Sequence, residues 1–202
     1  MSDLNITSAL NKKEPILSDI SITEVENLGM IDLRGDLGDK KFVNAVKKVL
    51  GCALPSKPRT SSQSKTATCL WLSPDQWLIT CPKDQVSTLL QSLNDALAGI
   101  HSLCVDVSDM RSVIRLDGNG AKEILMKGSS VDLTLAECSG GFVRRALFAE
   151  QAALFHIVSD KPTCIDLYVF RSYAAYVWNW LEVTSKPGGR VLLFGKQDQF
   201  ET

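Results

Sequence analysis

The segment at residues 105–128, VDVSDMRSVIRLDGNGAKEILMKG, predicts a strand, a tight turn and a helix in close succession. Residues 112–116 approximate the two-residue period of a half-buried strand, because Ile114 and Leu116 fall on the same face. The DGNG sequence at residues 117–120 interrupts that period and is typical of a turn. The segment therefore defines a basic unit in which a strand leads through a glycine-rich turn into a helix.

The helix after this turn has recognisable ends. Its apolar positions share one face and are Ala121, Ile124 and Leu125. Asn119 precedes them, and its side chain can accept a hydrogen bond from a free backbone N–H at the helix start. Gly128 follows the last turn, where a left-handed residue commonly ends a helix. We therefore expect Asn119 as the N-cap and Gly128 as the left-handed stop.

The same order of elements occurs earlier in the chain. Residues 30–35, MIDLRG, alternate like a strand that ends in glycine, and Asp39 then precedes an amphipathic helix that Gly51 follows. The inward-facing residues of that helix are Phe42, Val43, Val46, Val49 and Leu50. In each half, apolar strands lead into a second helix, expected at residues 84–98 and 171–184. These repeats predict an internal duplication.

The chain divides by composition into four segments. They are a polar arm at residues 1–18, a first half at 19–99, a second half at 100–185 and a C-terminal extension at 186–202, in which residues 191–194 are a candidate edge strand. Each half repeats strand, helix, strands and helix, which predicts an α+β fold of mainly antiparallel sheets with helices packed on one side. In the first half, Pro74 and Asp75 favour a type I turn between two strands, because proline presets a turn's backbone angle.

Charge and hydropathy exclude several classes of function. The net charge is −1 and the isoelectric point is near 6.1, so no field of cations is available for nucleic acid or anionic lipid. No apolar run approaches the ~20 residues that span a bilayer. The N-terminus has acids and a proline where a signal peptide needs an apolar core. We therefore expect a soluble cytoplasmic protein without nucleic-acid or membrane partners.

The cysteines fit a reducing compartment. They are Cys52, Cys69, Cys81, Cys104, Cys138 and Cys164. None forms a C-x-x-C pair or stands at zinc-like spacing from a histidine, and most lie in apolar, strand-like sequence. Small buried hydrophobic side chains are the favoured interpretation, and no metal site is expected.

Four motifs in series resemble one known superfamily. Residues 105–128 resemble the Asp-[Val/Leu]-Ser, strand, Leu-x-Gly-x-x-Ala, Ile-Leu pattern of the folate-binding aminomethyltransferases, and residues 72–78, LSPDQWL, resemble their Pro-Asp-x-Trp-Leu turn. Residues 130–133, SVDL, and residues 170–181, FRSYAAYVWNWL, are similar to two later motifs. The four motifs occur in the same order as in this superfamily and span about residues 31–185. Together they most resemble the gamma-subunit family of heterotetrameric sarcosine oxidase.

The resemblance implies a small non-catalytic subunit of a complex that oxidatively demethylates sarcosine to glycine, yielding hydrogen peroxide and either formaldehyde or methylene-tetrahydrofolate. It implies large flavoprotein subunits and a small zinc-binding subunit as partners, which hold FAD, FMN, NAD and tetrahydrofolate, and no cofactor in this chain. The chain departs from true aminomethyltransferases at residues 109–111, where DMR replaces their usual His-Met-Gly, and it is too short for their additional C-terminal domain. Methylene transfer by this chain alone is therefore not expected.

No constellation of residues indicates a catalytic centre. The only histidines are His101 and His156, and His156 alternates within a strand, which favours a structural role over a general base. The glycines at residues 118–120 lack the third glycine of a dinucleotide fingerprint, because Glu123 replaces it. Three aspartates are interleaved with two arginines and favour ion pairs over a cation site: Asp106, Asp109, Asp117, Arg111 and Arg115.

The helix expected at residues 171–184 has more apolar surface than a one-sided helix needs. Its core stripe is Ala174, Val177 and Leu181. Further apolar residues widen the arc to roughly 220°, against the ~100° of a one-sided helix; they are Tyr173, Tyr176, Trp178, Trp180 and Val183. Two interpretations remain open. The helix is buried between the halves, or Tyr173, Tyr176 and Trp180 form a partner-facing patch, since interface cores are rich in Tyr and Trp.

Three functions from different classes follow from these observations. The first is a structural subunit with obligate partners. The second is a stand-alone folate-binding or aminomethyltransferase-like protein that uses a cleft between the two halves. The third is an independent enzyme, which the lack of a catalytic constellation disfavours most.

Overall fold

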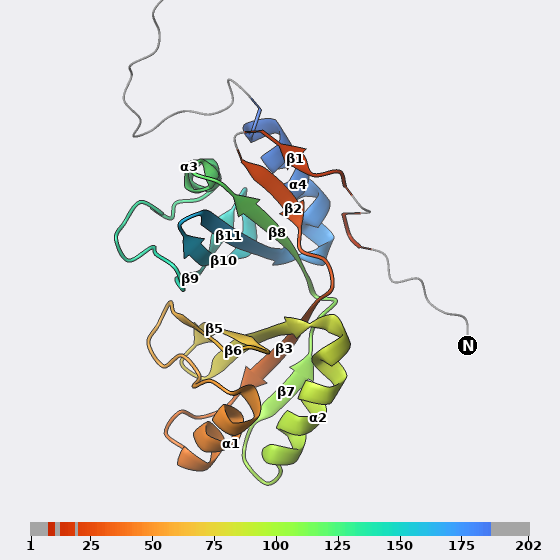
Figure 1. Cartoon of the computed structure of the whole chain (residues 1–202), viewed down its shortest axis with the longest axis vertical. Helices are drawn as coiled ribbons and strands as arrows, with labels where there is room; N and C mark the ends of the chain where they lie inside the picture. Colours follow the sequence, from red (N-terminus) through yellow and green to blue (C-terminus); the bar gives the residue numbers. More distant parts are fainter. Residues whose placement is uncertain (1–7, 11–12, 19, 187–202) are drawn as a thin grey trace, which may run out of the picture.

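The computed structural model describes residues 8–10, 13–18 and 20–186, which form two sheets facing each other across the middle of the molecule (Figure 1). The first sheet has the spatial order β1 (Ile16–Leu17), β2 (Ser21–Glu24), β8 (Arg111–Asp117), β11 (Thr163–Phe170), β10 (Gln151–Asp160) and β9 (Val143–Phe148). The second has the order β4 (Ser61–Gln63), β5 (Thr68–Ser73), β6 (Gln76–Pro82), β3 (Leu28–Arg34) and β7 (Leu103–Asp106). Adjacent strands in both sheets are antiparallel.

The helices lie on the outer faces of the two sheets (Figure 1). α1 (Lys40–Leu50) and α2 (Val86–Ala96) share a hydrophobic core with the second sheet. α3 (Ala121–Lys127) and α4 (Ala174–Thr184) share one with the first sheet. Short 3₁₀ turns, η1 (Lys83–Gln85) and η2 (Arg171–Tyr173), lead into α2 and α4. The predicted α+β class, with antiparallel sheets and helices packed on one side, is confirmed.

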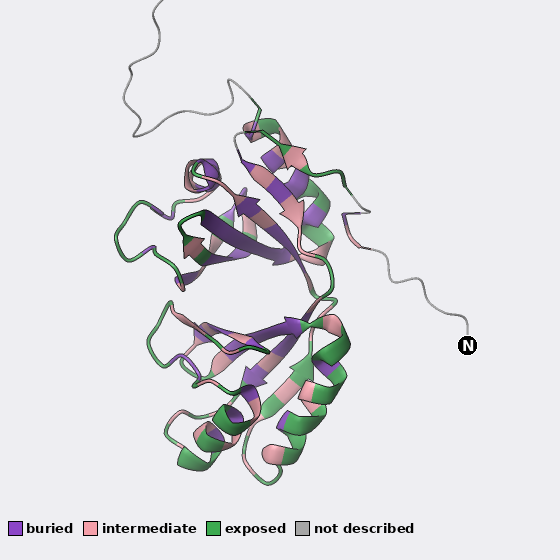
Figure 2. Ribbon diagram, in the orientation of Figure 1, coloured by how far each residue is buried: buried purple, intermediate pink, exposed green. Residues whose placement is uncertain are grey.

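The central strands of each sheet are buried on both faces. Along β3, Ile31 and Leu33 belong to the core on the helix side, whereas Met30 belongs to a third cluster between the sheets. β8 likewise contributes Ile114 to the helix side and Val113 to the cluster between the sheets. Figure 2 shows the buried residues concentrated in the strands, while exposed residues lie on the outer surfaces of the helices. The half-buried strands predicted from sequence are thus covered on their second face by the other sheet.

The internal duplication is visible in the topology. The series β3, α1, β4, β5, β6, α2 is repeated as β8, α3, β9, β10, β11, α4. The spatial order β4-β5-β6-β3 in one sheet matches β9-β10-β11-β8 in the other. Each half therefore folds the same succession of elements into the same arrangement.

The two halves exchange a strand. β2 precedes β3 in the chain but pairs with β8 of the other half, through Ile22 opposite Leu116. β7 precedes β8 but pairs with β3 of the first half, through Leu33 opposite Cys104. Each sheet is therefore completed by a strand that leads into the opposite half, so the sequence boundary at residues 99 and 100 does not separate two independent sheets.

The ends of α1 match their predicted chemistry. The Asp39 side chain accepts a hydrogen bond from the backbone N–H of Lys41 at 2.8 Å, and Gly51 ends the helix in the left-handed conformation with φ 72°. The hairpin between β5 and β6 also lies where it was expected, with Pro74 and Asp75 at its tip. Local side-chain chemistry is sufficient to define these turns.

The predicted ends of α3 are wrong in detail. The N-cap is Gly120 rather than Asn119, and no side chain caps the helix. The cause is Gly118, whose φ of 121° turns the chain so that its carbonyl accepts from Ala121 N at 3.1 Å, with Asn119 inside the turn. Gly128 follows the helix end as expected, but its φ of −101° is not left-handed. A Cβ there would lie 2.8 Å from Phe148, so close packing, not backbone handedness, requires glycine.

The described part of the N-terminal arm packs on the second half of its own chain. Leu10 is 1% exposed and belongs to the core around α3 and α4. β1 extends the first sheet by pairing Ile16 with Ile22. The Lys13 ammonium donates to the Asn179 side chain of α4 at 3.4 Å. Residues 191–194, the candidate edge strand, lie outside the described residues.

Candidate functional site

The outer face of α4 carries exposed aromatic side chains. Tyr173 is 46% exposed, Tyr176 48% and Val183 63%. Tyr173 ends η2 three positions before Tyr176, and Val183 lies seven positions, about two helical turns, after Tyr176, so the three side chains follow one face; we call them the α4 outer patch. The opposite face of α4 is buried against the first sheet through Ala174, Val177, Trp178 and Leu181. The helix is therefore a rigid platform for the patch.

Trp180 belongs to the core and not to the exposed patch. Its ring packs edge-to-face on Phe148 of β9, with ring centroids 4.9 Å apart, and it is only partly exposed. α4 packs on the outer face of the first sheet, so the interpretation that it is buried between the two halves is wrong, and the partner-facing patch stays a prediction. Trp178 and Trp180 are explained by burial within this chain, whereas Tyr173 and Tyr176 are left at the surface.

A cavity of about 350 Å³ lies between the two sheets. Its lining comes from β4, β5 and β6 on one side and from β8, β10 and β11 on the other, so both halves of the duplicated fold contribute. Most of the side chains that line it are polar, and they include Ser61, Thr80, Arg115, His156, Asp166 and Tyr168. This volume lies within the ~300–1,000 Å³ range of small-molecule sites.

An ion pair occupies one wall of this cavity. Arg115 Nε and Nη2 donate to the two carboxylate oxygens of Asp166 at 2.7 and 2.9 Å, in the bidentate geometry that gives the strongest carboxylate contacts. Asp166 is 4% exposed. Hydrogen bonding to this carboxylate raises the pKa of Arg115 above its already high value. The ion pair therefore stabilises the charged form of Arg115.

His156 lies directly across from Asp166 on the neighbouring strand β10. Its Nε2 is 3.3 Å from Ser61 Oγ of the other sheet, and its Nδ1 is buried without a hydrogen-bond partner. Burial is the main cause that lowers the pKa of His156 to about 4; Arg115 also lowers it, and Asp166 opposes the shift. The imidazole is therefore neutral at physiological pH. Its contact with Ser61 joins the two sheets.

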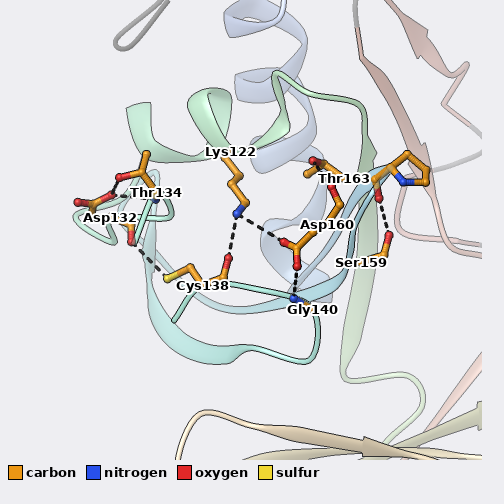
Figure 3. Close-up of polar contacts among 9 residues, drawn as sticks. Lys122, Asp132, Thr134, Cys138, Gly140, Ser159, Asp160 and Thr163 are labelled. Atoms are coloured by element: carbon orange, nitrogen blue, oxygen red, sulfur yellow. Dashed lines mark hydrogen bonds and ion pairs between the residues drawn. The ribbon is translucent and has the colours of Figure 1, made fainter. Parts of the chain in front are cut away.

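The loop after α3 is fixed by polar contacts at the rim of the first sheet (Figure 3). Lys122 Nζ donates to the carbonyl of Cys138 at 2.8 Å and lies 3.7 Å from the Asp160 carboxylate. Asp160 also accepts from the backbone N–H of Gly140 at 2.7 Å. The next residue, Gly141, accepts from Ser61 N at 2.8 Å across the gap between the sheets. These contacts hold the second half in register against β4.

The predicted pairing of the charged residues around β8 is different in the structure. Arg115 pairs with Asp166, which sequence reasoning did not single out, and Asp109 pairs with Lys83 at 3.1 Å. Arg111 lies over the ring of Phe170 at 4.7 Å. A signal for Asp166 was present, because it is the one charged residue in the apolar strand sequence TCIDLYVF of β11. A buried carboxylate in such a strand requires a partner.

Two kinds of site are not found in the part of the chain that the structure describes. No cluster of three or more His, Cys, Asp or Glu side chains is arranged to hold a metal ion. No helix among these residues has both the length and the apolar character needed to cross a bilayer.

Comparison with solved structures identifies the fold. A chain of the glycine cleavage system aminomethyltransferase T from Bartonella henselae matches 79% of this chain with a TM-score of 0.62 and 13% identity, and the match covers 44% of that chain. A chain of the heterotetrameric sarcosine oxidase from Corynebacterium sp. U-96, in complex with pyrrole 2-carboxylate, matches 85% of this chain and 87% of its own length, with a TM-score of 0.77 and 22% identity. The fold is thus that of the aminomethyltransferase-like proteins.

The family follows from the sequence comparison. The model of the sarcosine oxidase, gamma subunit family matches residues 34–186. A curated relative, sarcosine oxidase subunit gamma from Arthrobacter sp., is 33% identical over 90 residues, which are 44% of this chain and 43% of that protein. This chain belongs to the sarcosine oxidase gamma subunit family, as its motifs predicted.

Proposed function

We propose that this chain is the non-catalytic gamma subunit of a cytoplasmic heterotetrameric sarcosine oxidase. Such a complex demethylates sarcosine oxidatively to glycine, with hydrogen peroxide and formaldehyde or methylene-tetrahydrofolate as further products. The family match over residues 34–186 carries the proposal, and the fold shared with a chain of the Corynebacterium complex supports it. Large flavoprotein subunits and a small zinc-binding subunit are the partners, and they hold FAD, FMN, NAD and tetrahydrofolate.

The α4 outer patch is the proposed contact with a large subunit. Tyr173 and Tyr176 are about half exposed on a helix whose other face is anchored in the core. Tyrosine contributes large contact area with little loss of side-chain freedom, which is why it is common among the residues that dominate binding energy.

Co-expression tests the proposal. The tagged chain, produced together with its candidate flavoprotein and zinc-binding partners, is expected to purify as a yellow complex with sarcosine-dependent peroxide formation. The tagged chain alone is expected to be colourless and inactive. A chain that purifies without flavoproteins from such a strain, or that oxidises sarcosine alone, would contradict the proposal.

The cavity between the sheets favours one alternative, a stand-alone folate-binding protein. Its volume of about 350 Å³ and its place in an aminomethyltransferase-like fold support this function. Its ionised groups, however, already satisfy each other, because Arg115 and Asp166 form a bidentate pair. Titration calorimetry of the isolated chain with tetrahydrofolate distinguishes the two functions: a non-catalytic subunit gives no saturable heat, whereas a folate-binding protein does.

A further inference from the structure

Two cysteines from separate elements meet at the end of α1. Cys52 follows the helix stop Gly51, and Cys69 lies on β5. Their Sγ atoms are 3.9 Å apart. A disulfide bond of ~2.05 Å therefore needs the sulfurs to approach by about 1.9 Å, which is within the reach of side-chain rotation.

The surroundings of the pair favour a reactive thiolate on Cys52. Ser62 lies opposite Cys69 in the β4–β5 pairing, and its Oγ is 3.9 Å from Cys52 Sγ. The hydrogen bond from Cys69 is the main cause that lowers the pKa of Cys52 to about 6, although burial opposes it. The same interaction, together with burial, raises the pKa of Cys69. One sulfur is therefore poised as the nucleophile and the other remains a thiol.

Exposure separates the two roles further. Cys52 is partly exposed, whereas Cys69 has no exposed surface. The remaining four cysteines lack this pairing with a second sulfur among the described contacts, and burial raises the pKa of each: Cys81, Cys104, Cys138 and Cys164. A low pKa together with access from solvent is what distinguishes oxidisable cysteines from inert ones.

We propose that Cys52 and Cys69 form a redox-active dithiol that a peroxide converts to a disulfide. The Cys52 thiolate attacks one peroxide oxygen, the O–O bond breaks, and hydrogen peroxide yields Cys52 sulfenic acid and hydroxide. The Cys69 sulfur then attacks the Cys52 sulfur and forms the S–S bond, and its thiol proton passes to the displaced oxygen, which leaves as water. The proton that Cys52 released on forming the thiolate neutralises the hydroxide. Two thiols and one hydrogen peroxide thus give one disulfide and two waters, with two electrons passing from the sulfurs to the peroxide.

The consequence is a covalent link between the end of α1 and β5. The two residues are 17 positions apart, so the disulfide closes a loop that includes β4. This site is independent of the α4 outer patch and of the complex that the chain joins, so the proposal stands or fails separately from the proposed function.

Thiol counting and peptide mapping of the full chain test the proposal. The reduced protein, freed of reductant without air and treated with equimolar hydrogen peroxide, is expected to keep four of its six free thiols and to lose the mass of two hydrogen atoms. Trypsin should then release the peptide of residues 49–59 joined to that of residues 66–83, with fragment ions placing the link at Cys69 and not Cys81. The rate should fall as pH is lowered through about 6.

Matched variants assign the order of the two steps. In Cys69→Ser, Cys52 should stop at the sulfenic acid, which dimedone captures, whereas Cys104→Ser should lose the same two thiols as the natural chain. Circular dichroism confirms that each variant is folded, and the peptide map of the natural chain decides the question without them. Six thiols retained under peroxide, or a link between any other pair, would overturn the proposal.

Discussion

At the scale of single residues, Arg115 and Asp166 show how the inner faces of the two sheets tolerate charge. Asp166 is almost fully buried, and Arg115 supplies two hydrogen bonds to it from the adjacent strand. A buried carboxylate left without such a partner is strongly destabilising, whereas an apolar pair of similar volume is often neutral. The pair therefore constrains which strands can lie side by side more than it stabilises the fold.

Replacing one member of this pair is expected to be costly. Arg115→Met leaves the Asp166 carboxylate buried and unpaired. Loss of one partner of a fully buried ion pair costs about 3–5 kcal/mol. Because the Arg115 side chain is 36% exposed, we expect a smaller loss of about 2–4 kcal/mol in the free energy of unfolding. The double change Arg115→Met with Asp166→Leu should recover most of that loss. Urea unfolding of the two variants measures both values, and equal losses would show that the charge pairing is unimportant.

Because His156 is buried, we expect the free energy of unfolding to fall in mild acid. Its pKa is lowered to about 4 in the folded chain, against about 6.5 when unfolded. Between these pH values the unfolded chain binds the proton and the folded chain does not, so stability falls as pH falls from about 6.5 to about 4, by roughly 3 kcal/mol. From pH 7 to pH 4, the unfolding free energy of the natural chain should fall by roughly 3 kcal/mol more than that of His156→Gln. Parallel curves would refute this account.

Sequence reasoning reached some of these residues and not others for a physical reason. The placement of His156 in a strand was inferred from alternation along the sequence, which is a local property. The partner of Arg115 depends on the pairing of β8 with β11, which brings together residues 51 positions apart. Likewise, the contact between Cys52 and Cys69 depends on how α1 ends above β5, and no pattern in the cysteine spacing indicated it.

At the scale of elements, the ends of a helix were predictable only where the end residues act on their own local backbone. Asp39 and Gly51 act on their own backbone neighbourhood, so the ends of α1 could be read from the sequence. α3 begins after a turn made by Gly118, and Gly128 ends it beside the rings of Phe148 and Trp180. These features depend on tertiary packing. Sequence reasoning therefore placed the N-cap at Asn119 instead of Gly120 and wrongly expected Gly128 to be left-handed.

Gly128→Ala tests whether packing is the reason for this glycine. The new Cβ would lie 2.8 Å from Phe148 and 3.0 Å from Trp180, both of which are held in the core, so we expect a loss of about 1–3 kcal/mol in unfolding free energy. Gly140→Ala is the matched control, because its Cβ would meet nothing closer than 3.6 Å, and it should change stability by less than about 0.5 kcal/mol. Similar effects of both substitutions on thermal unfolding would argue against crowding at Gly128.

At the scale of the whole molecule, strand exchange makes the two halves interdependent. The repeat of strand, helix, strands and helix was visible in the sequence, and so was the α+β class. The exchange of β2 and β7 was not visible in the sequence, because each of these strands pairs with a strand that is distant along the chain. The same holds for the packing of sheet on sheet, which buries Met30 and Val113 between the halves.

The interdependence predicts that neither half folds alone. A polypeptide of residues 19–99 lacks β7 and carries β2 without its partner β8, while residues 100–186 lack β2. Each is expected to show little of the native circular dichroism, and the two mixed together should regain it. Independent, cooperative unfolding of either fragment would contradict the role of the exchanged strands.

The dissociation constant of the isolated chain from the proposed large flavoprotein subunits tests the central claim most directly. Tyr176→Ala in the α4 outer patch should raise this constant roughly 30-fold, equivalent to about 2 kcal/mol, and leave the unfolding free energy of the chain unchanged. Leu103→Ala is the control, since Leu103 is similarly exposed at 46% but lies on β7 of the other sheet, and it should leave binding unaltered. If Tyr176→Ala binds like the natural chain, or if no flavoprotein subunit binds at all, the account of this chain as a subunit docked through α4 is wrong.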